Sequence, residues 1–108
     1  MSIDRFKNIT LQQMEAIIAL VEEGSFSRAA KRMLLTQPAL TKNIKNAEDC
    51  IGVRLANRSS AGISLTPEGK ILYNYARRMV RLREEAKEKV LALRKESGGN
   101  IYLSASTI

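Results

Sequence analysis

The stretch that decides the fold runs from residue 25 to residue 52 and reads SFSRAAKRMLLTQPALTKNIKNAEDCIG. Its second half predicts a helix over about 37–51, because Thr36 is a good N-cap, proline is tolerated in a first helical turn, and Gly52 suits a left-handed end. One face of this helix is apolar and consists of Leu40, Ile44, Ala47 and Ile51. The opposite face is polar and mostly basic, with Pro38, Thr41, Lys42, Lys45 and Asp49. The apolar face of this helix is therefore expected to pack in the core, and the basic face is expected to be exposed to solvent.

Two shorter helical patterns precede this one. Residues 25–33 predict a short helix that either Ser25 or Ser27 can cap, and Leu34 and Leu35 form an apolar hinge after it. Further upstream, apolar residues recur at spacings of three and four between Thr10, a suitable cap, and Gly24, a suitable stop: Leu11, Met14, Ile17, Ile18 and Val21. A short helix, a tight turn and a longer helix with a basic outer face form the helix-turn-helix arrangement.

A small hairpin is predicted after the third helix. Val53 and Leu55 suggest one strand, Ile63 and Leu65 a second, and the turn-rich loop 57–62 lies between them. Such a hairpin makes a wing. The fold class is therefore mainly α: a winged helix-turn-helix of three helices plus a two-stranded wing, over residues 1–66, followed by a long dimerisation helix.

The long helix is predicted over residues 67–97. Thr66 and Pro67 are strong start signals, and about 30 residues without a breaker give a helix of roughly 45 Å, too long to lie wholly on a small domain. Its apolar residues recur in heptad fashion in two sets, with one member out of register, and predict a dimer through Leu72, Tyr75, Met79, Leu82, Ala86, Val90 and Leu93. The first half of this stripe is expected to pack on its own domain. Residues 98–108 contain a break and then an alternating strand, as expected where a truncated further domain begins.

Composition narrows the class of protein. Among 108 residues, 18 are Lys or Arg and 11 are Asp or Glu, which gives a net charge of +7. Residues 24–66 alone carry seven basic and two acidic residues, so a polyanion is the first partner to consider. Histidine is absent and Cys50 is the single cysteine. A Ser-His-Asp triad, most catalytic zinc sites and a disulfide framework are therefore excluded, and a cytoplasmic protein that is not an enzyme and holds no metal is expected. There is no apolar run for a membrane span and no signal peptide.

The chemistry of the basic helix suits the DNA major groove. Gln37 can bond adenine in bidentate fashion, Thr41 can contact a base or a phosphate, and Lys42 and Lys45 can reach guanine or phosphate. Other candidates for DNA contact lie at the start of the second helix, at the cap of the third and in the hairpin: Ser27, Arg28, Thr36, Pro38, Arg58, Ser59 and Ser60. Simpler roles compete with these: Gln37 closing the first turn, Pro38 starting the helix, and Arg54 pairing with Glu48 or Asp49.

Four linked motifs resemble one family. They are residues 22–30 (EEGSFSRAA), 36–41 (TQPALT), Leu55 with Arg58, and 65–69 (LTPEG), and they are similar to the N-terminal DNA-binding domain of LysR-type transcriptional regulators. The resemblance implies a bacterial, nucleoid-associated regulator that binds an interrupted inverted repeat of double-stranded DNA as a homodimer, with dimers pairing into tetramers. It also implies no cofactor in this fragment and a small-molecule effector bound by the missing C-terminal domain.

Some residues depart from the family pattern. Lys42 stands where the family usually has arginine, which weakens a bidentate contact to guanine. Ala61 stands near a wing position that is often basic. One rival interpretation is that residues 70–96 form a basic amphipathic helix that docks on an acidic protein or a membrane surface, without DNA.

Overall fold

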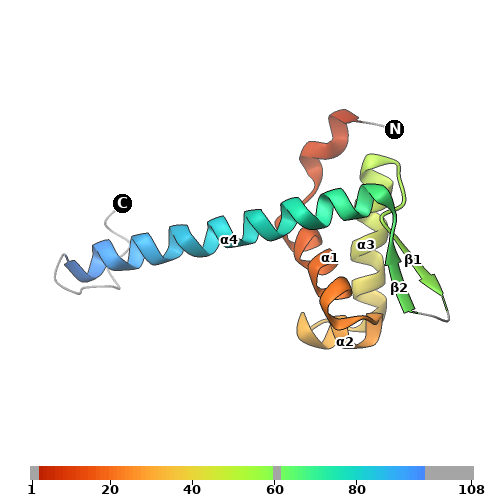
Figure 1. The fold of residues 1–108 in the computed structure, drawn as a ribbon, viewed down its shortest axis with the longest axis horizontal. Helices are drawn as coiled ribbons and strands as arrows, with labels where there is room; N and C mark the ends of the chain where they lie inside the picture. The colour runs from red at the N-terminus through yellow and green to blue at the C-terminus, as the bar shows by residue number, and fades with distance from the viewer. Residues whose placement is uncertain (1–2, 60–61, 97–108) are drawn as a thin grey trace. The chain divides into compact units, whose positions relative to one another are not determined.

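The structure, a computed structural model, describes residues 3–59 and 62–96 and follows the predicted order of elements (Figure 1). Its contacts divide the chain into a first unit, up to Arg78, and a second unit from Met79 on. The elements are η1 (Ile3–Asn8), α1 (Leu11–Glu23), α2 (Phe26–Arg32), α3 (Gln37–Ile51), β1 (Ala56–Ser59), β2 (Gly62–Leu65) and α4 (Pro67–Glu96). The winged helix-turn-helix is confirmed, whereas the short 3-10 helix η1 has no counterpart in the sequence prediction.

Each of the first three α-helices begins at a hydroxyl side chain. Thr10 forms a capping box with Gln13, in which each residue's backbone N–H donates to the other's side chain at 3.0 Å. Ser25 Oγ accepts from the backbone N–H of Arg28 at 3.1 Å, which settles the choice between the two candidate serines. Thr36 Oγ1 accepts from the backbone N–H of Ala39 at 3.2 Å. These local bonds fix where the helices start.

The core of the first unit lies between α1, α2 and α3. Its largest fully buried side chains are Ile17, Leu20, Leu40 and Leu55. The predicted apolar face of α3 is confirmed, because Leu40, Ile44, Ala47 and Ile51 are all buried. Ala29 and Ala30 of α2 are buried too, and these small side chains let α2 pack closely on its neighbours.

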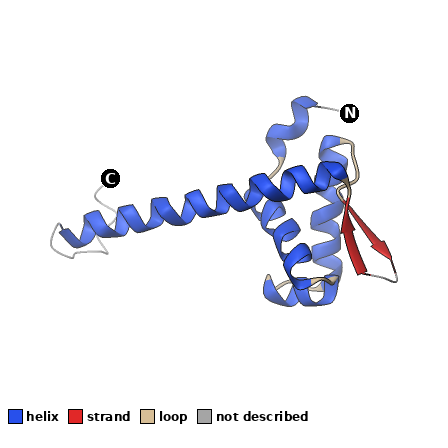
Figure 2. Cartoon of the chain, viewed as in Figure 1, coloured by secondary structure: helices blue, strands red, loops and turns tan. Residues whose placement is uncertain are grey.

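The first strand of the wing lies later in the chain than the sequence pattern suggested, whereas the second strand, at Ile63 and Leu65, is confirmed. β1 pairs antiparallel with β2 from Ala56 opposite Leu65 to Ser59 opposite Gly62, and Figure 2 shows the two as a hairpin beside α3. The expected first strand at Val53 and Leu55 is wrong. Leu55 is instead a buried core residue.

A carboxylate of α3 holds the backbone where β1 begins. Glu48 Oε2 accepts the backbone N–H of Leu55 at 2.7 Å and of Ala56 at 3.3 Å. Arg54 Nε lies 3.7 Å from the same oxygen, which confirms the pairing of Arg54 with Glu48.

The first turns of α4 belong to the winged unit. Leu72 and Ala76 are buried, with 6% and 0% of their surface exposed. The inclusion of Leu72 among the dimerisation residues is therefore corrected: its side chain is already covered by its own unit. The predicted strand of residues 98–108 lies outside the described residues.

Most exposed apolar residues of α4 repeat every eleven positions rather than every seven. Ile71, Leu82 and Leu93 form one such series, Tyr75 and Ala86 a second, and Met79 and Val90 a third. The heptad pattern included the buried Leu72 and left out the exposed Ile71. An eleven-residue repeat corresponds to about 3.67 residues per turn, which favours straight or slightly right-handed packing of paired helices.

No helix in the described part of the chain combines the length and the apolar character that a membrane span needs. Among those residues there is also no cluster of three or more potential metal ligands.

Candidate nucleic-acid interface

The polar face of α3 brings five predicted residues together. Gln37 and Pro38 occupy the first two positions of the helix, directly after the N-cap residue Thr36. With the next exposed turns they line one surface depression, formed by Gln37, Pro38, Thr41, Lys42 and Lys45. The side chains that the sequence assigned to base contact therefore form one continuous exposed surface.

The charge on this face is only lightly neutralised. Lys45 Nζ lies 4.0 Å from Asp49 Oδ1, and both side chains are more than 60% exposed (69% and 63%). A solvent-exposed pair at this distance stabilises a protein by about 0–1 kcal/mol, so an incoming anion can displace Asp49. Thr36 is exposed as well, but the structure shows its hydroxyl oxygen acting as the helix cap.

The start of α2 presents a second set of predicted contacts. Ser27 and Arg28 are both exposed in the first turn of α2, which begins at Phe26. At the other end of α2, Arg32 Nη1 lies 2.8 Å from Glu22 Oε1 and 3.3 Å from Glu23 Oε2. The hydrogen bond to Glu22 raises the pKa of Arg32. Arg32 thus links α2 to the end of α1.

The wing supplies Arg58 and Ser59, both exposed and both in β1 rather than in the predicted loop. Ser59 Oγ donates to Gly62 O at 3.4 Å across the hairpin. Ser60, the third predicted residue of the wing, lies outside the described residues.

Phe26 also belongs to this region, although the sequence analysis assigned it no role in the site. The guanidinium carbon of Arg58 lies 4.0 Å from the centroid of the Phe26 ring, which is a close cation–π contact. Phe26 and Arg58 come from α2 and β1, so neither spacing nor periodicity indicates that they meet. Arg58 also lines a groove between α3 and the wing with Phe26, Thr41 and Lys45. Thr41 and Lys45 line both this groove and the α3 depression, which makes the two surfaces continuous.

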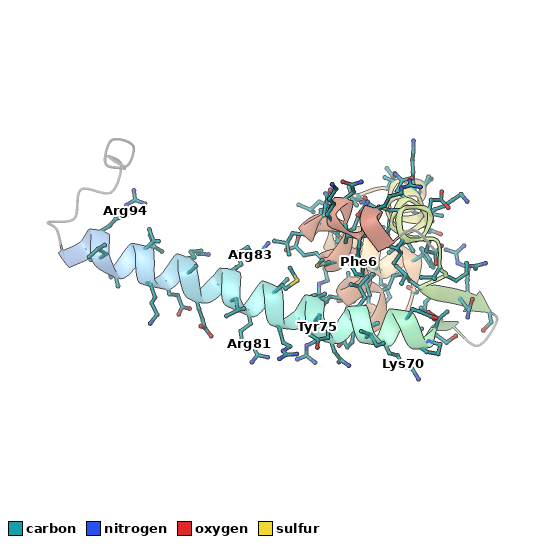
Figure 3. All side chains as sticks on the ribbon, turned by 90° about the horizontal axis from the view of Figure 1, so that it is seen from above. Phe6, Lys70, Tyr75, Arg81, Arg83 and Arg94 are labelled. Carbon is teal, nitrogen blue, oxygen red and sulfur yellow. The ribbon has the colours of Figure 1, made fainter. Side chains whose placement is uncertain are left out.

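The second unit presents charged and apolar surface along α4. Arg83 and Arg94 lie on one side of the helix and Arg81 on the other (Figure 3). Glu84 Oε2 lies 3.5 Å from Arg83 Nε, and Glu84 Oε1 lies 3.5 Å from Lys87 Nζ. Part of the positive charge of α4 is therefore paired within the helix. Among the residues of this unit that the structure describes, 79–96, five large apolar side chains are at least 40% exposed: Met79, Leu82, Val90, Leu91 and Leu93.

Known proteins share both the sequence and the fold. The HTH-type transcriptional regulator CysL of Bacillus subtilis is 38% identical over 93 residues, which are 86% of this chain and 31% of that protein. A probable RuBisCO transcriptional regulator of Phaeodactylum tricornutum is 37% identical over 97 residues, 90% of this chain and 32% of that protein. The crystal structure of the CbnR DNA-binding domain in complex with DNA has a TM-score of 0.70 and 33% identity, and the match covers 78% of this chain and 97% of that chain.

The fold and the exposed basic face define a winged helix-turn-helix protein. Residues 11–70 match the model of the bacterial regulatory helix-turn-helix proteins of the lysR family. The chain belongs to this family. It spans about a third of the length of the curated relatives it matches.

Proposed function

We propose that this chain is the DNA-binding part of a transcriptional regulator and binds an interrupted inverted repeat of double-stranded DNA as a homodimer. The observation that carries the proposal is the exposed face of α3, where Gln37, Pro38, Thr41, Lys42 and Lys45 line one depression. A major groove of about 12 Å admits a single helix with such a face.

In this arrangement the start of α3 reads bases. The amide of Gln37 matches the donor and acceptor of adenine, and Thr41 offers a hydroxyl to a base edge and a methyl group to thymine. Lys42, one turn from Pro38, reaches guanine or phosphate as a single charge. Pro38 presents an apolar ring on the same surface, suited to a thymine methyl group.

The elements around α3 hold the sugar-phosphate backbone. Ser27 and Arg28 at the start of α2, and Arg58 with Ser59 in the wing, are exposed polar groups. Lys45 joins them through the groove that it lines with Arg58. Phosphate contacts of this kind supply most of the affinity, so binding weakens steeply as the salt concentration rises.

The exposed apolar stripe of α4 is the interface through which two copies of the chain pair. It consists of Ile71, Tyr75, Met79, Leu82, Ala86, Val90 and Leu93. Because a lone exposed stripe of this length gains free energy by burial, two copies pair through it and present two recognition helices to successive half-sites.

The rest of the function belongs to the full-length protein. The relatives CysL and the RuBisCO regulator carry names of transcriptional regulators, which supports a role in regulation rather than catalysis. We infer that the protein acts on the nucleoid in the bacterial cytoplasm, that this part needs no cofactor, and that a small-molecule effector binds a further C-terminal domain. Pairing of dimers into tetramers is part of the same proposal.

Selection of bound duplexes from a random pool tests the proposal. We expect enrichment of two related half-sites in inverted orientation, with a fixed spacing that reports the dimer geometry. Failure to bind any duplex, even at low salt, contradicts it. The rival, docking of α4 on an acidic protein or an anionic membrane, predicts instead that anionic vesicles retain the chain and that changes at Lys42 and Lys45 have no effect.

A further inference from the structure

We propose that Phe26 is a positioning residue, which holds the guanidinium of Arg58 ready for a DNA phosphate beside the recognition helix. The inference rests on the proposed DNA-binding function and assigns a role to a residue that does not itself contact DNA. It starts from one contact: the guanidinium carbon of Arg58 lies 4.0 Å from the centre of the Phe26 ring.

Phe26 and Arg58 lie on elements of different rigidity. Phe26 is the first residue of α2, directly after the Ser25 cap, and it is half-buried against the helical core. Arg58 is an exposed residue of β1, a four-residue strand of a two-stranded hairpin. A long side chain on such a hairpin samples many rotamers in isolation. The Phe26 ring therefore anchors a mobile group to a rigid element.

The stacking leaves the chemistry of Arg58 intact. The flat face of a guanidinium lies on a ring, whereas its five N–H groups point outward in the plane of the group. They remain able to donate to phosphate oxygens. Lysine has no flat face, so an ammonium at position 58 keeps the charge but loses much of the stacking.

The position of the pair fits a phosphate contact. Phe26 and Arg58 line the groove between α3 and the wing together with Thr41 and Lys45, which also belong to the proposed base-reading face. Two carboxylates line the same groove, and each lies beside a basic side chain: Asp49 beside Lys45 and Glu48 beside Arg54. A duplex seated on α3 brings a backbone strand past this groove. Arg58 is ordered before binding, so less side-chain entropy is lost when the complex forms.

A double-mutant cycle on the full 108-residue chain tests the inference, with a mixed-sequence duplex at low salt as the probe. Phe26→Leu removes the ring and is expected to weaken binding about two- to fivefold. Phe26→Tyr keeps the ring and is expected to bind like the unmodified chain. In the Arg58→Gln background, Phe26→Leu is expected to have no further effect, because the group that it positions is gone.

The outcomes separate this inference from the proposed function. If the unmodified chain binds no duplex, both fail. If it binds and the Phe26→Leu penalty persists without Arg58, or is absent with it, only the positioning role is wrong.

A measurement without DNA provides a second criterion. The Nε–H proton resonance of Arg58 is expected to be shifted by the Phe26 ring current in the free protein, and to return to its ordinary position in Phe26→Leu. Thermal unfolding of each variant shows whether it is folded. If Phe26→Leu does not fold, the Arg58 resonance of the unmodified chain decides: a ring-current shift supports the inference, and an unshifted resonance overturns it.

Discussion

Gly69 in α4 lies against the backbone of Leu55 so closely that a Cβ at position 69 would overlap the Leu55 carbonyl oxygen. That oxygen accepts the backbone N–H of Thr66 at 3.0 Å. Thr66 Oγ1 in turn donates to Arg54 O at 2.7 Å and accepts the N–H of Gly69 at 3.0 Å. The start of α4 is therefore fastened to the segment between α3 and the wing, which sets where the hairpin leaves the core.

Gly69→Ala is expected to lower the free energy of unfolding by about 1–3 kcal/mol, because the new methyl group meets backbone that cannot move aside. In open space the same change inside a helix would raise stability, since alanine is the better helix former. Chemical denaturation measures the difference. Asn74→Ala, at an exposed position of α4, is the matched control and should change stability little. A Gly69→Ala variant as stable as the unmodified chain would contradict the close approach.

Leu34→Asn is expected to stabilise the protein by about 1 kcal/mol, because asparagine tolerates the left-handed region far better than leucine. Leu34 has φ of 59° in the turn between α2 and α3, and its side chain is 92% exposed, so little packing is lost. Leu34→Ala removes the same exposed surface without relieving the backbone and should leave the melting temperature nearly unchanged. Equal melting temperatures for the two variants would show that the backbone strain is negligible.

Gln37→Ala and Lys45→Ala are expected to affect DNA binding in different ways. Loss of the Gln37 amide should cost about 1–3 kcal/mol at one base position and relax the preference there. Loss of the Lys45 charge should weaken binding to all duplexes alike and reduce the slope of log affinity against log salt by about one. Competition binding with single-base variants of the selected site measures both. An unchanged base preference in Gln37→Ala would remove its base-reading role, and a sequence-selective effect of Lys45→Ala would contradict a phosphate contact.

Leu82→Glu is expected to abolish self-association, because it places a charge in the middle of the exposed stripe of α4. Leu82 is 61% exposed in the single chain. Leu91, which is 40% exposed, lies nine residues further along and therefore about half a turn round the helix. Leu91→Glu is thus the matched control and should leave the dimer intact. Sedimentation equilibrium distinguishes the two, and the stripe is not the interface if both variants stay dimeric or both dissociate.

Local chemistry made the helices predictable from the sequence. Thr10 and Thr36 cap α1 and α3 where the sequence placed them, since a cap needs only a hydroxyl and an N–H three residues later. The division of α3 into a buried face and a basic face follows from helical spacing alone, so the sequence by itself groups the residues that are proposed to read DNA. Their contacts with bases and phosphates stay predictions.

Tertiary contacts decided what spacing could not. Glu48 of α3 holds the N–H groups of Leu55 and Ala56, where the first strand of the wing, 56–59, begins. Burial of Leu72 changes which residues of α4 face outward, and with them the repeat, from seven to eleven. The contact of Phe26 with Arg58 joins two elements that no periodicity relates. The physical reason is common to all three: sequence patterns report bonds within a few residues, whereas these depend on which surfaces meet after the chain has folded.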